Sequence, residues 1–100
     1  MYKTEISDGK TTFIFESRLD TSACSGIEAG VISEITNSRD PIVFDIGKVD
    51  FVSSAFLRIC IMAAKKKGTG NFHVANAAPQ IKKVFKIAGM DQFLGEQLSS

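Results

Sequence analysis

The sequence has few of the residues that usually build metal or redox sites. It contains one histidine, His73, and two cysteines, Cys24 and Cys60, which stand far apart without a CxxC motif or a nearby histidine. These spacings predict no bound metal and no cofactor. Two free thiols without a secretory signal are typical of a cytoplasmic protein, and the cytoplasm is therefore the location that we expect.

Neither an excess of one charge nor a long apolar run is present. The chain has 12 basic and 11 acidic residues, whereas a general nucleic-acid binder carries a basic stripe, so we expect no nucleic-acid partner. The only basic run, residues 65–67, falls where a helix is expected to end, and cations there complement the helix dipole. The longest apolar helical stretch, near residues 55–64, is about half of a bilayer span, so no direct membrane insertion is expected.

The patterns that mark enzymes are also missing. His73 falls inside an expected strand, and no nucleophile-elbow glycines flank Ser53 or Ser54. The stretches GTGN and IAGM contain neither the Lys-Ser/Thr of a P-loop nor a dinucleotide-binding fingerprint. We therefore expect no enzymatic activity and no catalytic residue.

What the sequence does contain predicts one α/β domain. The 100 residues are 44% hydrophobic, with eight phenylalanines, which is enough for one core. YKTEIS and TTFIFES, separated by Asp8-Gly9, predict a β-hairpin. The run IVFDI, residues 42–46, predicts a central strand buried on both faces, and NFHVAN, residues 71–76, predicts another strand.

Three helices are predicted between and after these strands. Capping residues from Asp20 onward begin the first, which runs to about Asn37. The second covers residues 54–67, is expected to be buried on nearly every side, and ends at Gly68. Pro79 begins the third, whose predicted buried face contains Ile81, Val84, Phe85 and Ala88. The order ββαβαβα predicts a mixed β-sheet covered by α-helices.

Ser53 and Ser54 stand where the second helix begins, and two interpretations of them are open. A serine hydroxyl can accept a hydrogen bond from the first helical turn and stabilise it by about 1 kcal/mol. The same helix end also stabilises an anion, so the fold would tolerate a phosphoryl group on Ser54. Such a group adds about −1.5 to −2 charge and would expel a partner packed on this tip.

The stretch VDFVSSAFLRICIMAAKKKG, residues 49–68, resembles the central signature of STAS domains, particularly of bacterial anti-sigma factor antagonists. ESRLDTSAC resembles the Gly-x-Leu-Asp segment of that family. GTGNFHVANAAPQIKKVFKIAGMDQFL resembles its closing strand, its helix that starts with proline, and its final glycine and hydrophobic residues. The resemblance covers nearly the whole chain and implies a single STAS domain over residues 1–100.

Carried over residue by residue, the resemblance implies that Ser54 is the phosphoacceptor. It implies a partner-binding surface made of Asp20, Thr21, Ser53, Ser54, Phe56 and Arg58. The sequence departs from the family pattern at Phe56 and at Ser17, because the family has glycine at both positions. We expect the Phe56 side chain to enlarge the exposed tip, where it either obstructs a partner or anchors one.

The function that the resemblance implies is regulatory. The unphosphorylated chain would bind a cognate anti-sigma factor that is also a serine kinase of the ATP-binding type, and so release a sigma factor. Phosphorylation of Ser54 would abolish that binding, and a phosphatase is a further expected partner. The alternative is a structural or ligand-binding STAS subunit of a transport or signalling complex, in which Ser54 is not phosphorylated.

Overall fold

A β-hairpin opens the fold of this computed structural model, which describes residues 2–68 and 70–94. Strands β1 (Tyr2–Ser7) and β2 (Lys10–Leu19) pair antiparallel across a two-residue turn. Both turn residues have positive φ, 55° at Asp8 and 75° at Gly9. A turn of this kind matches the right-handed twist of the flanking strands, and the predicted hairpin is confirmed.

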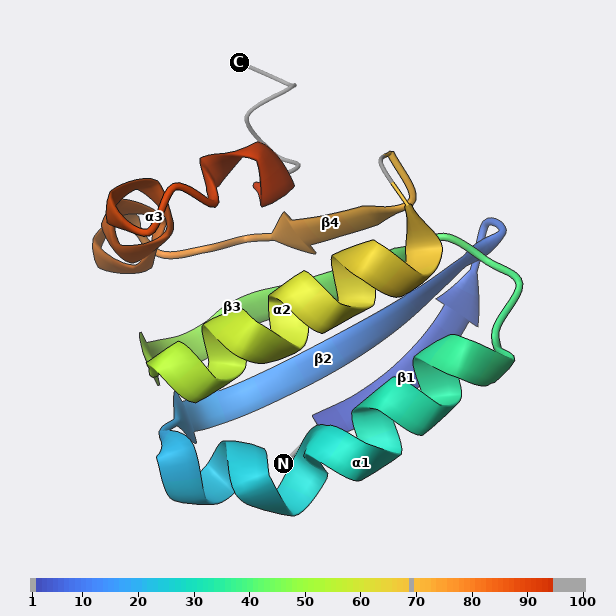
Figure 1. Cartoon of the computed structure of the whole chain (residues 1–100), viewed down its shortest axis with the longest axis horizontal. Coiled ribbons are helices and arrows are strands. Elements are labelled where there is room, and N and C mark those ends of the chain that lie inside the picture. The colour runs from blue at the N-terminus through green and yellow to red at the C-terminus, as the bar shows by residue number, and fades with distance from the viewer. Residues whose placement is uncertain (1, 69, 95–100) are drawn as a thin grey trace.

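Strands and helices alternate after the hairpin. The remaining elements are α1 (Thr21–Asn37), β3 (Ile42–Val52), α2 (Ser54–Lys67), β4 (Phe72–Ala75), α3 (Pro79–Ile87) and the short 3-10 helix η1 (Asp91–Phe93). The sheet has the strand order β1-β2-β3-β4, with the hairpin antiparallel and the other two pairings parallel (Figure 1). The predicted element order and the mixed sheet are therefore confirmed.

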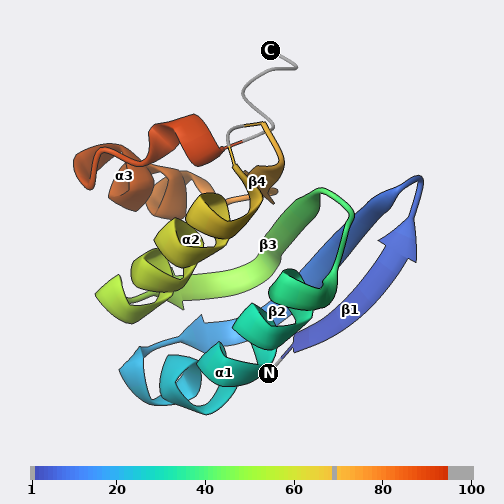
Figure 2. The same cartoon turned by 45° about the vertical axis from the view of Figure 1, so that its right-hand side comes forward.

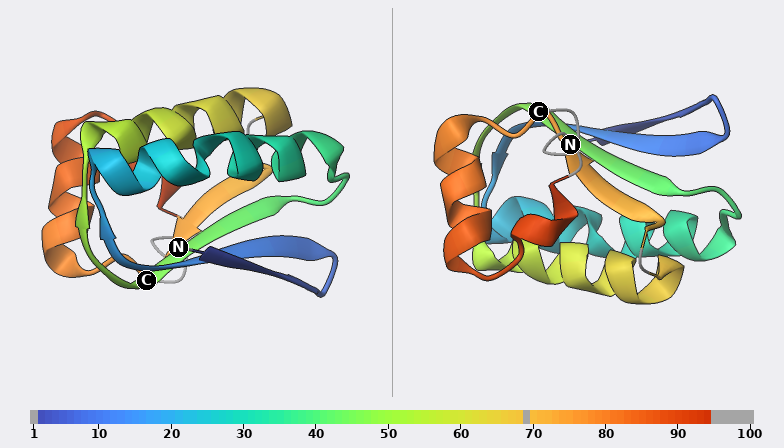
Figure 3. Two further views of the ribbon diagram at one scale, coloured as in Figure 1. Left: turned by 90° about the horizontal axis from the view of Figure 1, so that it is seen from below. Right: turned by 90° about the horizontal axis from the view of Figure 1, so that it is seen from above.

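The core lies between the sheet and two helices. Helices α1 and α2 lie side by side over one face of the sheet, and α3 stands at the end of the molecule where α2 begins (Figure 3). Phenylalanine rings from three strands and α2 meet beneath these helices, with centroids 4.9 to 6.5 Å apart. The rings belong to Phe13, Phe15, Phe44, Phe56 and Phe72.

Strand β3 is buried on one face only, so the prediction of a strand buried on both faces is wrong. Ile42, Phe44 and Ile46 are buried beneath the helices, whereas Val43 and Asp45 on the opposite face are half-buried. Helices α1 and α2 both cover the first face. The opposite face of β3 is therefore only half-buried, although the apolar Val43 lies on it.

Helices α2 and α3 are also less buried than predicted. Five residues form the buried stripe of α2: Ala55, Phe56, Ile59, Cys60 and Ala63. Ile61 is exposed, because α2 packs on α1 and the sheet and turns its remaining side to solvent. In α3, Ile81 and Phe85 are buried as predicted, but Val84 is 37% exposed, and Ala88, which follows the helix, is exposed as well. The predicted end of α2 is confirmed at Gly68, where φ is 85°.

Ser17 adopts a backbone conformation that favours glycine. Its φ is 69°, and the pairing of β2 with β3 shifts register between Ser17 and Arg18. A residue with a Cβ in the left-handed region is disfavoured by roughly 1–2 kcal/mol, because the Cβ approaches the following carbonyl. This strain gives a physical reason for the glycine that the resemblance places at this position.

Replacing Ser17 with glycine should therefore stabilise the fold. We expect Ser17→Gly to raise the free energy of unfolding by about 1 kcal/mol, measured by urea denaturation. The matched control is Ser7→Gly in β1, where φ is ordinary and glycine should lower it by about 0.5–1 kcal/mol. Equal destabilisation by the two substitutions would show that Ser17 is not strained.

Candidate functional site

The candidate site lies where two parallel strands end side by side. Leu19 of β2 pairs with Val52 of β3, so helices α1 and α2 begin at the same edge of the sheet. The carboxyl edge of parallel strands is where α/β proteins commonly bind their ligands. Asp20 precedes α1, and its Oδ1 accepts a hydrogen bond of 2.9 Å from the Ala23 N–H, which confirms the predicted helix start.

Ser53 joins the two helix starts, but its hydroxyl does not cap α2. Its N–H and its hydroxyl both donate to the Leu19 carbonyl, at 3.0 and 2.8 Å. The Cys24 thiol lies 3.6 Å from the same carbonyl oxygen, and burial raises the pKa of this thiol, so that it stays protonated. The predicted hydroxyl cap by Ser53 is therefore wrong, because the end of β2 offers its side chain a closer acceptor.

Ser54 is the first residue of α2 and is exposed to solvent. Among the described residues, none hydrogen-bonds its hydroxyl, so Ser54 does not cap the helix either. The first N–H groups of any α-helix have no acceptor within the helix and carry a partial positive charge. An exposed hydroxyl with no protein partner, at a helix end that favours anions, can accept a phosphoryl group without disturbing the packing.

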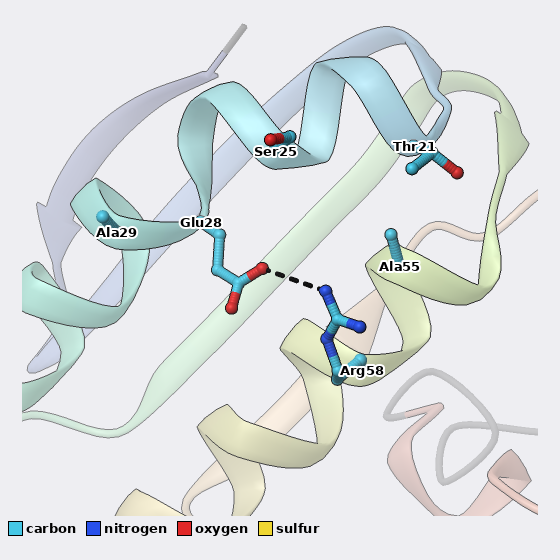
Figure 4. A pocket seen from close by; sticks show the side chains of 6 residues that line it. All are labelled: Thr21, Ser25, Glu28, Ala29, Ala55 and Arg58. Atoms are coloured by element: carbon cyan, nitrogen blue, oxygen red, sulfur yellow. Dashed lines mark hydrogen bonds and ion pairs between the residues drawn. The ribbon is translucent and has the colours of Figure 1, made fainter.

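A groove runs between α1 and α2 beside this edge. It encloses about 360 Å³ and is lined by Thr21, Ser25, Glu28, Ala29, Ala55 and Arg58. Figure 4 shows Arg58 reaching from α2 toward Glu28 of α1, with 3.4 Å between Nη2 and Oε1. The Arg58 side chain is largely exposed, and such surface ion pairs contribute only about 0–1 kcal/mol. Arg58 is therefore free to exchange Glu28 for another anion.

An apolar depression lies on the other side of Ser54, between α2 and α3. It encloses about 340 Å³ and is lined by Val52, Ser53, Ser54, Leu57, Val84, Ile87 and Ala88. Ile87 is 81% exposed. The sequence prediction placed Val84 in the core and gave Ile87 no role. The signal was present, because Ile87 falls outside the helix face that contains Ile81, Val84 and Phe85.

The prediction that Phe56 enlarges the exposed tip is wrong. Its side chain is 0% exposed, with its ring 5.4 Å from the ring of Phe15 and 5.8 Å from that of Phe44. Position 56 falls on the buried stripe of α2, which faces the sheet. The Phe56 side chain therefore neither obstructs nor anchors a partner.

The structure keeps His73 away from the serines. His73 pairs with Val43 near the start of β3, whereas Ser54 follows its end, roughly 30 Å further along the strand. Over residues 2–68 and 70–94, no cluster of His, Cys, Asp or Glu side chains could hold a metal ion. No helix in the described part of the chain has the length and apolarity needed to cross a membrane.

Known proteins are similar to this chain in sequence and in fold. No protein-family model matches the chain. BtrV of Bordetella bronchiseptica, which is named as an anti-sigma factor antagonist, is 25% identical over 84 residues, covering 82% of this chain and 72% of BtrV. An anti-sigma factor antagonist from Mycobacterium paratuberculosis has a similar solved structure, with a TM-score of 0.81 and 22% identity, covering 94% and 81% of the two chains.

The anti-sigma factor antagonist SpoIIAA is similar in both of its solved forms. The unphosphorylated form gives a TM-score of 0.78 at 16% identity, covering 94% of this chain and 85% of SpoIIAA. The phosphorylated form from Bacillus gives 0.70 at 16% identity, covering 94% and 88%. The fold is that of the STAS anti-sigma factor antagonists. The recognition of a STAS fold from the sequence is thereby confirmed, while the roles of Asp20, Thr21, Ser53, Ser54 and Arg58 in this chain stay predictions.

The two serines at the start of α2 should differ in their effect on stability. Ser53→Ala removes a hydrogen bond to a partly buried carbonyl, so we expect the free energy of unfolding to fall by about 0.5–1.5 kcal/mol. Ser54→Ala removes no such contact and should change it by no more than about 0.5 kcal/mol. Urea denaturation of both variants tests this difference, and equal losses would contradict the geometry.

Proposed function

We propose that this protein is an anti-sigma factor antagonist of the cytoplasm, with no catalytic activity of its own. Its unphosphorylated form binds a cognate anti-sigma factor that is also a serine kinase of the ATP-binding type, and a sigma factor is thereby released. The observation that carries this proposal is the exposed hydroxyl of Ser54 at the start of α2. The fold supports it, because SpoIIAA has this fold and is known in unphosphorylated and phosphorylated forms.

Ser54 is the proposed phosphoacceptor because Ser53 is already engaged. The Ser53 hydroxyl donates to the Leu19 carbonyl and lies 4.0 Å from the Cys24 sulfur in a partly buried place. Phosphorylation of Ser53 would break that hydrogen bond and bring an anion beside a carbonyl oxygen. The Ser54 oxygen, by contrast, can attack the γ-phosphorus of ATP held by the kinase, which supplies the base for the hydroxyl proton and releases ADP.

The phosphate on Ser54 would act through charge. It adds about −1.5 to −2 charge to a surface that already contains the Asp20 carboxylate, so an acidic or apolar partner surface is repelled. Arg58 stands four residues after Ser54, and side chains at this spacing are neighbours on a helix. Arginine binds phosphate more strongly than it binds an exposed carboxylate, so Arg58 would leave Glu28 and alter the α1–α2 groove. A phosphatase would reverse both changes.

The proposed partner surface surrounds Ser54. From the surface predicted by the sequence, it retains Asp20, Thr21, Ser53 and Arg58. The buried Phe56 is left out, and Leu57, Val84 and Ile87 of the apolar depression are added. Exposed apolar residues beside a polar rim are typical of protein interfaces. This surface therefore offers an apolar contact that binds the partner, and a hydroxyl whose phosphorylation would weaken that contact.

The proposal is tested with a candidate anti-sigma factor kinase, to be sought among the products of the neighbouring genes. After incubation with ATP, mass spectrometry should find phosphate on Ser54 in the parent and in Ser53→Ala. Ser54→Ala should incorporate none and should still bind the kinase in a calorimetric titration. Ile87→Ser should weaken that binding by about tenfold, or about 1.4 kcal/mol.

The matched control for Ile87→Ser is Ile61→Ser, which changes an exposed isoleucine of α2 outside the depression and should bind as the parent does. Phosphate on Ser53, or incorporation that persists in Ser54→Ala, would contradict the assignment of the phosphoacceptor. Absence of any phosphorylation and binding would favour the alternative, a STAS subunit of a transport or signalling complex.

A further inference from the structure

Strand β1 has one unpaired edge within the described part of the chain. It lies at the end of the sheet and pairs with β2 alone, as Figure 2 shows. An unpaired strand edge presents a row of backbone donors and acceptors that can pair with another strand. What such an edge can bind depends on the side chains that it carries and on the direction of its backbone groups.

The hairpin fixes which backbone groups of β1 point outward. The pair next to its two-residue turn, Ser7 and Lys10, exchanges both backbone hydrogen bonds, and the direction alternates along the strand. Lys3 and Glu5 therefore direct their N–H and C=O groups toward β2. Tyr2, Thr4 and Ile6 direct theirs toward the open edge.

We propose that the open edge of β1 pairs antiparallel with the same edge of a second copy of this chain, about a two-fold axis at Thr4. In this register Thr4 faces Thr4 of the second copy, and Tyr2 faces Ile6 of the second copy. These are pairs whose backbone groups point outward in both copies, so their hydrogen bonds can form. Lys3 then faces Glu5 of the second copy, and each two-fold dimer contains two such opposite-charge pairs.

The side chains select this register over its neighbours. Moving the axis to Lys3 would set Lys3 opposite Lys3, and moving it to Glu5 would set Glu5 opposite Glu5. Like charges directly opposite on neighbouring strands destabilise the pairing, whereas opposite charges stabilise it. The sequence of β1 is therefore self-complementary in charge in one register.

The other face of β1 is complementary in shape. Ile6 is 74% exposed and would be covered by the Tyr2 ring of the second copy. That ring is held in place, because its hydroxyl donates to Glu34 at 2.8 Å and its centroid lies 5.7 Å from that of Phe13. Burial, with the Glu34 carboxylate beside it, raises the pKa of Tyr2 to about 12, so the hydroxyl stays a donor at neutral pH.

One feature limits the strength of this association. Glu34 also accepts a hydrogen bond from Thr4 at 3.0 Å, so the Glu34 carboxylates of the two copies would approach the axis. Each Glu34 carboxylate accepts hydrogen bonds from Tyr2 and Thr4 of its own copy. Because the two carboxylates repel each other and the paired edge is only six residues long, we expect a weak dimer. None of the residues proposed to contact the anti-sigma factor lies on β1, so this inference stands apart from the proposed function.

The test is a charge exchange followed by sedimentation velocity over a range of protein concentrations. The parent should show a concentration-dependent monomer–dimer equilibrium. Lys3→Glu and Glu5→Lys should each weaken self-association by about tenfold or more, since each sets like charges opposite each other. An equimolar mixture of the two variants should restore the dimer, because each carboxylate-bearing edge then meets a lysine-bearing edge.

Two further variants complete the test. Ile6→Ser should weaken the dimer, whereas the matched control Ile61→Ser in α2 should leave it unchanged. Thermal unfolding confirms that every variant is folded. The proposal is overturned if the parent is monomeric at the highest concentration, or if the mixture of Lys3→Glu and Glu5→Lys associates no better than either variant alone.

Discussion

The parallel pairing of β2 with β3 is the constraint on which the rest of the site depends. Because both strands point the same way, the helices that follow them begin at one edge of the sheet. The Leu19 carbonyl then accepts two hydrogen bonds from Ser53, which fixes the start of α2 against the end of β2. With Ser53 held inward, the next residue, Ser54, is turned to solvent.

The aromatic core makes this edge a rigid platform. Phe56, in the first turn of α2, packs edge to face against Phe15 and beside Phe44, so the helix is anchored two residues after Ser54. A change of charge at Ser54 would therefore act on the surface around it, where the exposed Arg58 can move while the buried Phe56 stays packed. The proposed switch would need no change in the core of the domain.

Much of the fold was predictable because its signals are local. Asp8-Gly9 specifies its turn by positive φ, Asp20 caps the helix that it precedes, and Gly68 ends α2 in a conformation that disfavours other residues. The resemblance predicted a site at the start of α2, and the roles of its residues stay predictions. The resemblance failed at Phe56, because α2 is apolar on several sides and its periodicity does not say which side meets the sheet.

Long-range contacts account for the other differences. The acceptor of the Ser53 hydroxyl lies 34 residues earlier in the chain, so the residues next to Ser53 in the sequence do not predict it. Val84 and Ile87 are apolar, as core residues usually are. They are exposed because α3 lies at the end of the sheet. Exposure of this kind depends on the whole packing arrangement, which a pattern within one helix does not contain.

The central claim is that charge at Ser54 alone switches partner binding while the fold is kept. Protein carrying phosphoserine at position 54, made by site-specific incorporation, should be titrated with the anti-sigma factor beside the unmodified protein, and both should be unfolded in urea. The account predicts that the phosphorylated form binds at least about a hundredfold more weakly, with a free energy of unfolding within about 1 kcal/mol of the unmodified form. Equal binding by the two forms, or weaker binding accompanied by loss of the folded state, would contradict it.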